Sequence, residues 1–198
     1  MTIRKMIYLG IVSIVIVLAY FAWKLTARSA YESAEYTVLE SDRPFEIRRY
    51  PDLPMATTNM QYGSQGDDGS FMRLFRYIGG ANKQEQKVPM TTPVFMEPEA
   101  NGAQGQMGFV IPKHVAEHRV PEPTGEQVQI RKRAGGRFAV IRFAGRMNRE
   151  TVAKAEEQLR TWINKKGLVG ELDAELAGYD PPWTPGPFRR NEVLIRLK

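Results

Sequence analysis

The chain of 198 residues contains no cysteine. This absence excludes disulfide bonds, thiolate metal ligands and any prosthetic group bonded through cysteine sulfur. The sequence also has no Asn-x-Ser/Thr sequon, so nothing in it indicates N-glycosylation. Both absences are compatible with a bacterial envelope protein.

Recognisable catalytic motifs are missing as well. The only two histidines, His114 and His118, are four residues apart and share a face only in a helix. Because Pro112 and Pro121 flank them, we expect a solvated loop there and not a metal site. No serine lies in a Gly-x-Ser-x-Gly elbow, and no glycine pattern of the phosphate-binding type occurs. The sequence therefore predicts no enzymatic activity of its own.

The formal net charge of +6 does not indicate a nucleic-acid partner. The basic residues are spread along the chain, and the densest run is Arg131-Lys132-Arg133. The segment Val128–Arg133, which includes this run, has the pattern of a strand with one solvated face. A basic stripe or helix typical of nucleic-acid recognition is not visible, so no nucleic-acid binding is predicted.

One long apolar run stands near the N-terminus. Met6–Trp23 comprises 18 residues without a charge, flanked by Arg4 and Lys5 before and by Lys24 and Arg28 after. As a helix it would span about 27 Å, close to the hydrocarbon thickness of a bilayer. We expect an uncleaved single-pass transmembrane anchor.

A cleaved signal peptide is the alternative, because Ala27-Arg28-Ser29 is a possible though poor cleavage site. The early charges, together with the terminal amine, slightly outweigh the later ones. This balance favours an N-terminus in the cytosol and a soluble domain on the extracytoplasmic, periplasmic side.

The chain then divides into an anchor at residues 1–24, a polar linker at 25–35 and one domain at 36–198. Within the domain, apolar periodicity and turn residues predict two amphipathic helices, one around 71–78 ending at Gly79-Gly80 and one that Asn148 caps and Gly167 follows. Alternation predicts strands at 36–39, 45–50, 55–60, 88–96, 106–111, 128–133, 138–143, 172–178 and 192–197.

The order of these elements is strands, helix, strands, and then the same again. We therefore predict an α+β fold: a mostly antiparallel sheet or distorted barrel of two related halves, with two packed helices, preceded by one transmembrane helix.

Three motifs in this order carry a family resemblance. The first is Phe75-Arg76-Tyr77-Ile78-Gly79-Gly80-Ala81-Asn82 and the second is Val88-Pro89-Met90-Thr91-Thr92-Pro93-Val94. The third is the proline-rich loop Tyr179-Asp180-Pro181-Pro182-Trp183-Thr184-Pro185, followed by Arg189-Arg190-Asn191-Glu192-Val193. With these motifs the chain resembles the SOUL haem-binding proteins from about Tyr36 to Lys198.

The resemblance implies non-covalent binding of haem or a related tetrapyrrole, between the first helix and the proline-rich loop. By motif, the implied contact residues are Phe71, Leu74, Phe75, Arg76, Ile78, Trp183, Thr184 and Pro185. Apolar side chains cover a porphyrin face, and Arg76 or Arg73 meets a propionate. No residue is singled out as an axial ligand of the iron. The implied role is a carrier, buffer or scavenger at the membrane surface.

Other interpretations remain open. Phe71, Leu74, Phe75 and Ile78 have the i, i+3, i+4, i+7 spacing by which any amphipathic helix reaches its own core, which leaves Met72, Arg73 or Arg76 at the rim. The loop from Trp183 to Phe188 is also suited to a protein partner. An enzyme that removes the metal from a tetrapyrrole is a further alternative, with Tyr77, Tyr179 and Asp180 as its acid/base candidates.

Overall fold

The computed structural model describes residues 5, 8, 10–17, 31–61, 68–97, 99, 104–181 and 184–198. The chain divides into two units, residues 1–30 and residues 31–198. In the first unit residues 10–17 are helical, and their apolar side chains are exposed. No helix among the described residues is long and apolar enough to cross a membrane. The predicted anchor, Met6–Trp23, lies partly outside the described residues and stays a prediction.

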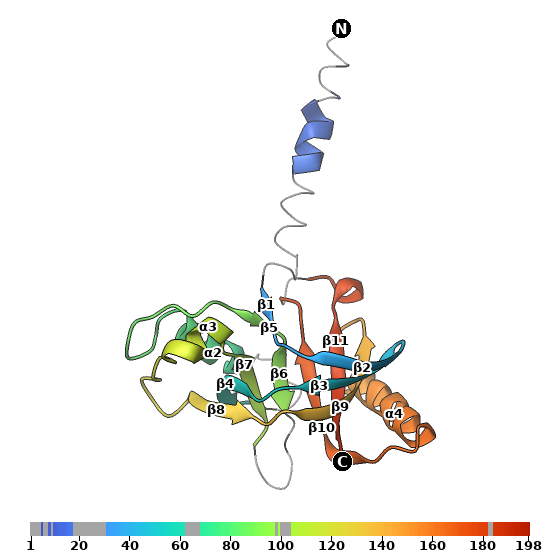
Figure 1. The fold of residues 1–198 in the computed structure, drawn as a ribbon. Coiled ribbons are helices and arrows are strands. Elements are labelled where there is room, and N and C mark those ends of the chain that lie inside the picture. Colours follow the sequence, from blue (N-terminus) through green and yellow to red (C-terminus); the bar gives the residue numbers. More distant parts are fainter. Residues whose placement is uncertain are drawn as a thin grey trace. The chain divides into compact units, whose positions relative to one another are not determined.

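The second unit is built on a nine-stranded sheet in the order β2-β3-β9-β11-β10-β6-β7-β4-β8, with every neighbouring pair antiparallel (Figure 1). Its strands are β2 (Thr37–Asp42), β3 (Phe45–Tyr50), β4 (Leu53–Asn59), β6 (Val94–Glu97), β7 (Gln106–Val110), β8 (Gln129–Arg133), β9 (Gly136–Phe143), β10 (Gly170–Gly178) and β11 (Asn191–Leu197). Two short strands, β1 (Glu32–Ser33) and β5 (Thr91–Thr92), pair in parallel beside it. The helical elements are α2 (Ser70–Ile78), α3 (Lys113–His118), α4 (Arg149–Lys165) and the short 3₁₀ turn η2 (Gly186–Phe188).

The topology repeats about the centre of the sheet. On one side β4 leads through α2 to the hairpin β6–β7, and on the other β9 leads through α4 to the hairpin β10–β11. Outward from the central β6–β10 pair, the next strands are β7 and then β4 on one side, and β11 and then β9 on the other. The two sides therefore have equivalent orders. This is the order of elements that the sequence predicts. Among the described residues no ladder joins the outer strands β2 and β8, so the sheet is open.

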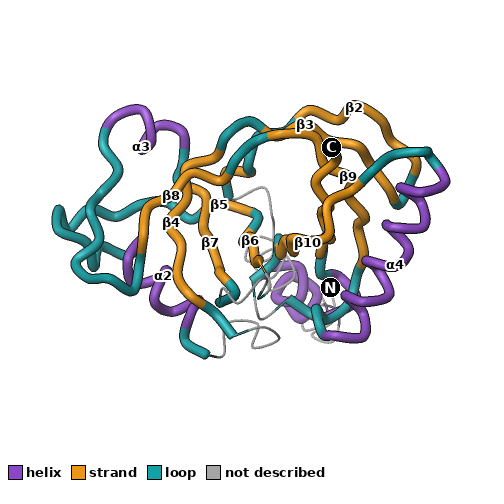
Figure 2. Tube along the Cα trace, turned by 90° about the horizontal axis from the view of Figure 1, so that it is seen from below, coloured by secondary structure: helices purple, strands orange, loops and turns teal. Residues whose placement is uncertain are grey.

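Alternation along the strands separates two apolar cores. Ala139 and Ile141 of β9 belong to the core under the helices, whereas Phe138 and Val140 belong to the core on the other face. The first core includes buried residues of both α2 and α4. Figure 2 shows these two helices on the same side of the sheet, near its two ends. Because residues 31–198 contain both cores, we expect them to fold as an independent domain.

The sheet is strongly curved. The edge strand β8 therefore contacts strands that are not its neighbours in the sheet, on the face away from the helices. Arg133 of β8 is 4% exposed and lies over the rings of Tyr50, Phe95 and Phe138, at 4.4–5.1 Å from their centroids. Its Nε donates to Glu175 of β10 at 2.7 Å. Strand β8 therefore closes over the second core without a backbone ladder to its opposite edge.

Local signals at the helix ends match the structure in part. The Asn148 cap of α4 is confirmed: its side chain accepts from the Thr151 amide at 2.9 Å in a capping box. At α2 the N-cap is Gly69, while Asp68 accepts from the Ser70 amide at 3.0 Å. The loop predicted around the two histidines is wrong, because residues 113–118 form the short helix α3. Pro112 stands at the N-cap of this helix, a position that requires no amide donor.

Candidate functional site

Helix α2 separates the predicted contact residues into two groups. Leu74 and Ile78 are buried, at 0% and 6% exposure, in the core beneath the helix. They therefore pack beneath the helix and are not exposed on its outer surface, so their predicted contact with a ligand stays a prediction. Because 3.6 residues complete a turn, the neighbouring positions 72, 75 and 76 point away from the sheet.

The outward face of α2 is apolar and aromatic. Phe75 is 48% exposed and Met72 is 46% exposed. The Phe75 ring stacks on Phe71 with a centroid distance of 5.9 Å and an interplanar angle of 15°. Phe71 in turn packs edge-on against the buried Phe109 of β7 at 5.3 Å. The sheet thus braces a flat ring that remains open to a ligand; we call Met72, Phe75 and Arg76 the α2 face.

The two arginines of α2 differ in their hydrogen bonding within the domain. Arg73 donates to the Thr58 hydroxyl at 3.0 Å, to the Asp68 carbonyl at 3.2 Å and to the Asn59 carbonyl at 2.6 Å. It ties the helix to the end of β4. The exposed side chain of Arg76 has no hydrogen-bond or ion-pair partner within the described part of the chain. Of the two, Arg76 is the cation available to an incoming carboxylate.

Grooves lie along the other flank of the helix. A cavity of about 250 Å³ is lined by Arg73, Arg76 and Tyr77 together with the segment 123–128. It shares Pro123, Gly125 and Val128 with a second groove of about 750 Å³, whose lining comes from residues 120–130. These volumes lie near the range of ordinary small-molecule sites.

The motif at the end of α2 builds the wall of these grooves. Tyr77 donates its hydroxyl to the Pro121 carbonyl at 2.7 Å, and burial raises the pKa of this phenol to about 12. Asn82 donates its side-chain amide to the carbonyls of Tyr77 at 3.0 Å and Gln86 at 2.7 Å. These two motif residues therefore have structural roles, and Tyr77 is a poor proton donor or acceptor at neutral pH.

The proline-rich loop is ordered by contacts to the chain that follows β9. The Gly145 amide donates to the Gly186 carbonyl at 3.0 Å, and Arg189 donates to the Thr184 carbonyl at 2.7 Å. Thr184 is 4% exposed, whereas Pro185 is exposed. Trp183 lies outside the described residues, so its predicted role stays a prediction.

The helix and the loop belong to different halves of the sheet. Helix α2 packs on β4 and β7, while the loop joins β10 to β11; Figure 1 shows the turn of Gly186–Phe188, in red, away from α2. Among the described residues, those that line the grooves beside α2 come from the helix and Ala81 after it, from β4, β7 and β8, and from the chain leading into β8. The expected pairing of Phe75 and Arg76 with Thr184 and Pro185 is therefore not formed by these grooves.

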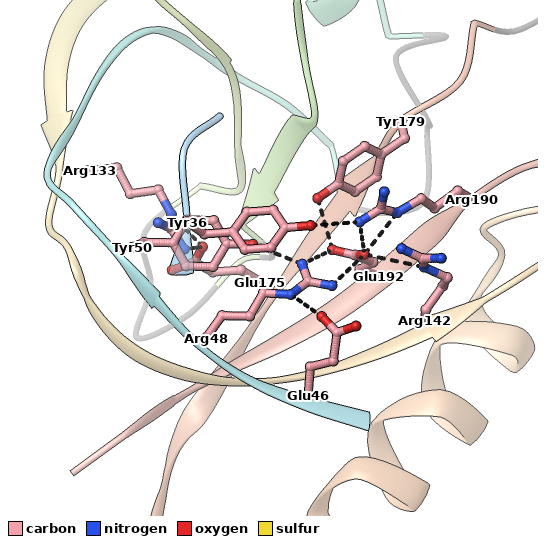
Figure 3. Close-up of polar contacts among 10 residues, drawn as sticks. All are labelled: Tyr36, Glu46, Arg48, Tyr50, Arg133, Arg142, Glu175, Tyr179, Arg190 and Glu192. Carbon is pink, nitrogen blue, oxygen red and sulfur yellow. Dashed lines mark hydrogen bonds and ion pairs between the residues drawn. The ribbon is translucent and has the colours of Figure 1, made fainter. Parts of the chain in front are cut away.

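A buried charge network lies on the opposite face of the sheet, and sequence reasoning missed it (Figure 3). Glu192 of β11 is 0% exposed and accepts from Arg48 of β3 at 2.7 and 3.0 Å. It also accepts from Arg190 at 2.6 and 2.9 Å and from the Tyr179 hydroxyl at 3.0 Å. Arg48 itself donates to Tyr50 at 3.1 Å. The family motifs contain Tyr179, Arg190 and Glu192, but nothing local in the sequence identifies Arg48 as their partner.

The network holds its central carboxyl ionised. Burial alone would raise the pKa of Glu192, but the hydrogen bonds and charges of Arg48 and Arg190 outweigh it and lower that pKa below its ordinary value. Burial, with the Glu192 charge, raises the pKa of Tyr179 far above that of a free phenol. Tyr179 is therefore a neutral hydrogen-bond donor at physiological pH. The network fixes the base of the proline-rich loop against β3, which is a structural task.

Comparison with known proteins agrees with the motifs. A family model described as SOUL heme-binding protein matches residues 31–196. Two similar curated proteins are Heme-binding protein 1 from Xenopus tropicalis and from Xenopus laevis. Each is 27% identical to this chain over 156 residues, which cover 75% of the chain and 81% of the relative.

Similar solved structures confirm the α+β architecture with its large antiparallel sheet. The C-terminal domain of EcmrR has a TM-score of 0.52 at 12% identity, covering 82% of this chain and 98% of that domain. A hydrolase from Listeria innocua has a TM-score of 0.56 at 10% identity, covering 81% and 94% respectively. At such low identity these two structures show the fold alone.

Proposed function

The chain belongs to the SOUL heme-binding protein family, and we propose that it binds haem or a related tetrapyrrole non-covalently on the α2 face. The proposed role is a carrier, buffer or scavenger that catalyses no reaction of its own. Heme-binding protein 1, to which the chain is similar, supports this proposal by its name.

The observation that carries the proposal is the exposed, braced aromatic ring of Phe75. An amphipathic helix ordinarily turns such a side chain toward its core, yet here the ring is half exposed beside Met72. A flat ring held at a fixed angle is suited to offset stacking on a porphyrin. Arg76, next to it on the helix, is suited to one propionate at the edge of the macrocycle.

Magnitudes indicate which contacts dominate. Covering about 300 Å² of apolar surface contributes roughly 7 kcal/mol before the several kcal/mol that association costs. An exposed arginine–propionate pair adds only about 0–1 kcal/mol. We therefore expect apolar contact to set an affinity no tighter than micromolar, with binding that is reversible and needs no axial ligand.

The proposed location follows from the sequence. We propose that Met6–Trp23 anchors the chain in a membrane and that the domain lies on the periplasmic side of a bacterial membrane. The predicted linker, residues 25–35, is shortened by the structure, because residues 31–35 belong to the domain and include strand β1. The support is the uncharged run and its flanking charges alone. Fractionation of cells that express the full chain tests this proposal, since a membrane-anchored chain resists extraction by salt and is released by detergent.

Titration of haemin into residues 31–198 tests the binding itself. A saturable shift of the Soret band is expected, and Phe75→Ala is expected to weaken it. The absence of a saturable shift up to about 50 μM haemin would contradict the proposal. Analysis of the pigment after incubation distinguishes a carrier from a metal-removing enzyme, because only the enzyme would leave free porphyrin.

A further inference from the structure

One end of the domain carries an arginine-rich surface around an exposed phenylalanine, Phe188. It is formed by two segments, 142–149 and 184–190, which contain five arginines and no Asp or Glu. We call this surface the arginine–Phe188 end. The Gly145 amide, which donates to the Gly186 carbonyl, joins the two segments. The side chain of Asn191, the residue after the second segment, donates through its Nδ2 to the Gly145 carbonyl at 2.9 Å.

The side chains at this end are presented to solvent. Phe188 is 71% exposed on the turn η2. The Arg142 side chain is 51% exposed, and Arg146 and Arg149 are exposed as well. Because η2 is a stiff turn built on Pro185 and Pro187, the exposed ring is held out at little further cost in conformational entropy.

Nearby acids neutralise only part of this charge. Buried Glu192 pairs with Arg48 and Arg190 and lies 3.8 Å from Arg142. Asp180 accepts from the Arg190 amide at 2.6 Å, and Glu150 stands in the first turn of α4. Arg146, Arg149 and much of Arg142 remain as exposed positive charge beside the aromatic ring.

The first strand of the domain lies at the same end. Strand β1 pairs with β5, which leads directly into β6, and the first residue of β6, Val94, pairs with Gly178 at the start of the proline-rich loop. Arg190 also donates to Tyr36, just after β1, at 3.4 Å. Figure 1 shows β1 and the red turn of η2 at the same end of the domain.

The chain that precedes this strand reaches an apolar run after a short interval. Seven residues, 24–30, separate Met6–Trp23 from the domain. Such a segment spans at most about 25 Å. If the run is held in a bilayer, at most this length of chain connects it to the first residue of the domain. Exposed arginines with an interfacial aromatic residue are the composition that anionic lipid surfaces attract.

We propose that the arginine–Phe188 end docks on an anionic lipid surface, with the arginines against the headgroups and Phe188 inserted among them. The docking is independent of haem binding, because the α2 face lies on the other half of the sheet. It holds the domain in one orientation against the membrane.

Sedimentation of residues 31–198 with lipid vesicles tests this proposal. We expect binding to vesicles of phosphatidylcholine and phosphatidylglycerol at 7:3 and much weaker binding to phosphatidylcholine alone, with the difference lost at high salt. Replacement of Arg146 and Arg149 by Glu is expected to weaken binding at least about 25-fold, from about fivefold per arginine removed. Phe188→Ser is expected to weaken it about tenfold.

A matched control carries the same change of charge elsewhere. Lys165 lies at the far end of α4, about 24 Å along the helix from Arg149, and Arg119 follows α3. The double replacement of these two residues by Glu should keep vesicle binding within a fewfold of the unmodified domain. The proposal is overturned if the domain does not bind the anionic vesicles, as expected for a surface that serves a protein partner instead. It is equally overturned if the Arg146/Arg149 variant binds as the control does.

Discussion

Replacing Glu192 by glutamine tests the structural role of the buried network. The substitution keeps the shape of the side chain but removes its charge from between Arg48, Arg190 and the Tyr179 hydroxyl. Two guanidinium groups would then share a neutral partner, one of them only 1% exposed. Breaking a buried ion pair in this way costs about 3–5 kcal/mol. That is a large part of the roughly 5–15 kcal/mol that stabilises an ordinary domain.

Urea unfolding of residues 31–198, followed by tryptophan fluorescence and circular dichroism, measures this loss. The control is Glu46→Gln, which removes a partly exposed carboxylate that also accepts from Arg48, at 2.6 Å. We expect the control to lose about 1 kcal/mol or less. A Glu192→Gln loss below about 1 kcal/mol, or equal to that of the control, would refute the account of the network.

The same network gives a pH dependence. Because the folded-state pKa of Glu192 lies below its ordinary value of 4.5, its contribution to stability is complete above that pH. The contribution is lost as the pH falls through the folded-state pKa, so Glu192→Gln should flatten the acid side of the stability profile. An unchanged acid limb in an otherwise folded variant would contradict this sign.

Three further predictions concern the site and a partly buried carboxyl, that of Glu175. Phe75→Ala should weaken haemin binding about tenfold with little loss of stability. Leu74→Ala should instead cost about 2–5 kcal/mol of stability. Equal effects of the two substitutions on stability would contradict the division of α2 into two faces. Arg76→Gln should weaken haemin binding at most about fivefold and leave the urea midpoint unchanged. Arg73→Gln should cost about 1–3 kcal/mol of stability. The reverse pattern would show that Arg73 is the residue that meets the ligand. Burial raises the pKa of Glu175 above its ordinary value of 4.5, despite the nearby charge of Arg133. The contribution of Glu175 to stability is therefore most favourable below that pH and falls as the pH rises through the folded-state pKa. Glu175→Gln should remove this decline from the stability profile.

Much of the secondary structure was predictable because its signals are local, although helix α3 at residues 113–118 was missed. Strand β3 occupies the predicted residues 45–50, and α4 begins at the predicted cap, Asn148. Pairing of β6 with β10 at the centre of the sheet was not predictable in the same way, since it joins residues far apart in the chain. The repeated order of elements indicated two halves but not which strands meet between them.

The candidate site shows the limit of periodicity. The spacing of Phe71, Leu74, Phe75 and Ile78 predicts one apolar stripe, but the stripe is wider than the surface that β4 and β7 cover. Leu74 and Ile78 fall at its centre and are buried, while Phe75 falls at its edge and is half exposed. Only the packed structure distinguishes them.

Long-range polar contacts left no trace in the sequence pattern. Arg48 and Glu192 are separated by 144 positions, and Arg48 stands in a strand whose neighbouring residues are also charged. The hydrogen bonds from Arg73 to the end of β4 could not be predicted from the sequence either. They nevertheless decide which arginine of α2 can meet a ligand. Side-chain hydrogen bonds of this kind depend on the tertiary fold and not on spacing.

The most direct measurement of the central claim is a methionine-methyl NMR spectrum of residues 31–198 during addition of haemin, whose ferric iron broadens nearby signals. Met72 lies on the α2 face and is half exposed, whereas Met55 is buried in the core on the other face of the sheet. We expect the Met72 methyl signal, assigned with Met72→Leu, to broaden first and the Met55 signal to stay sharp. An unaffected Met72 signal at haemin concentrations that shift the Soret band would place the macrocycle elsewhere and contradict the account.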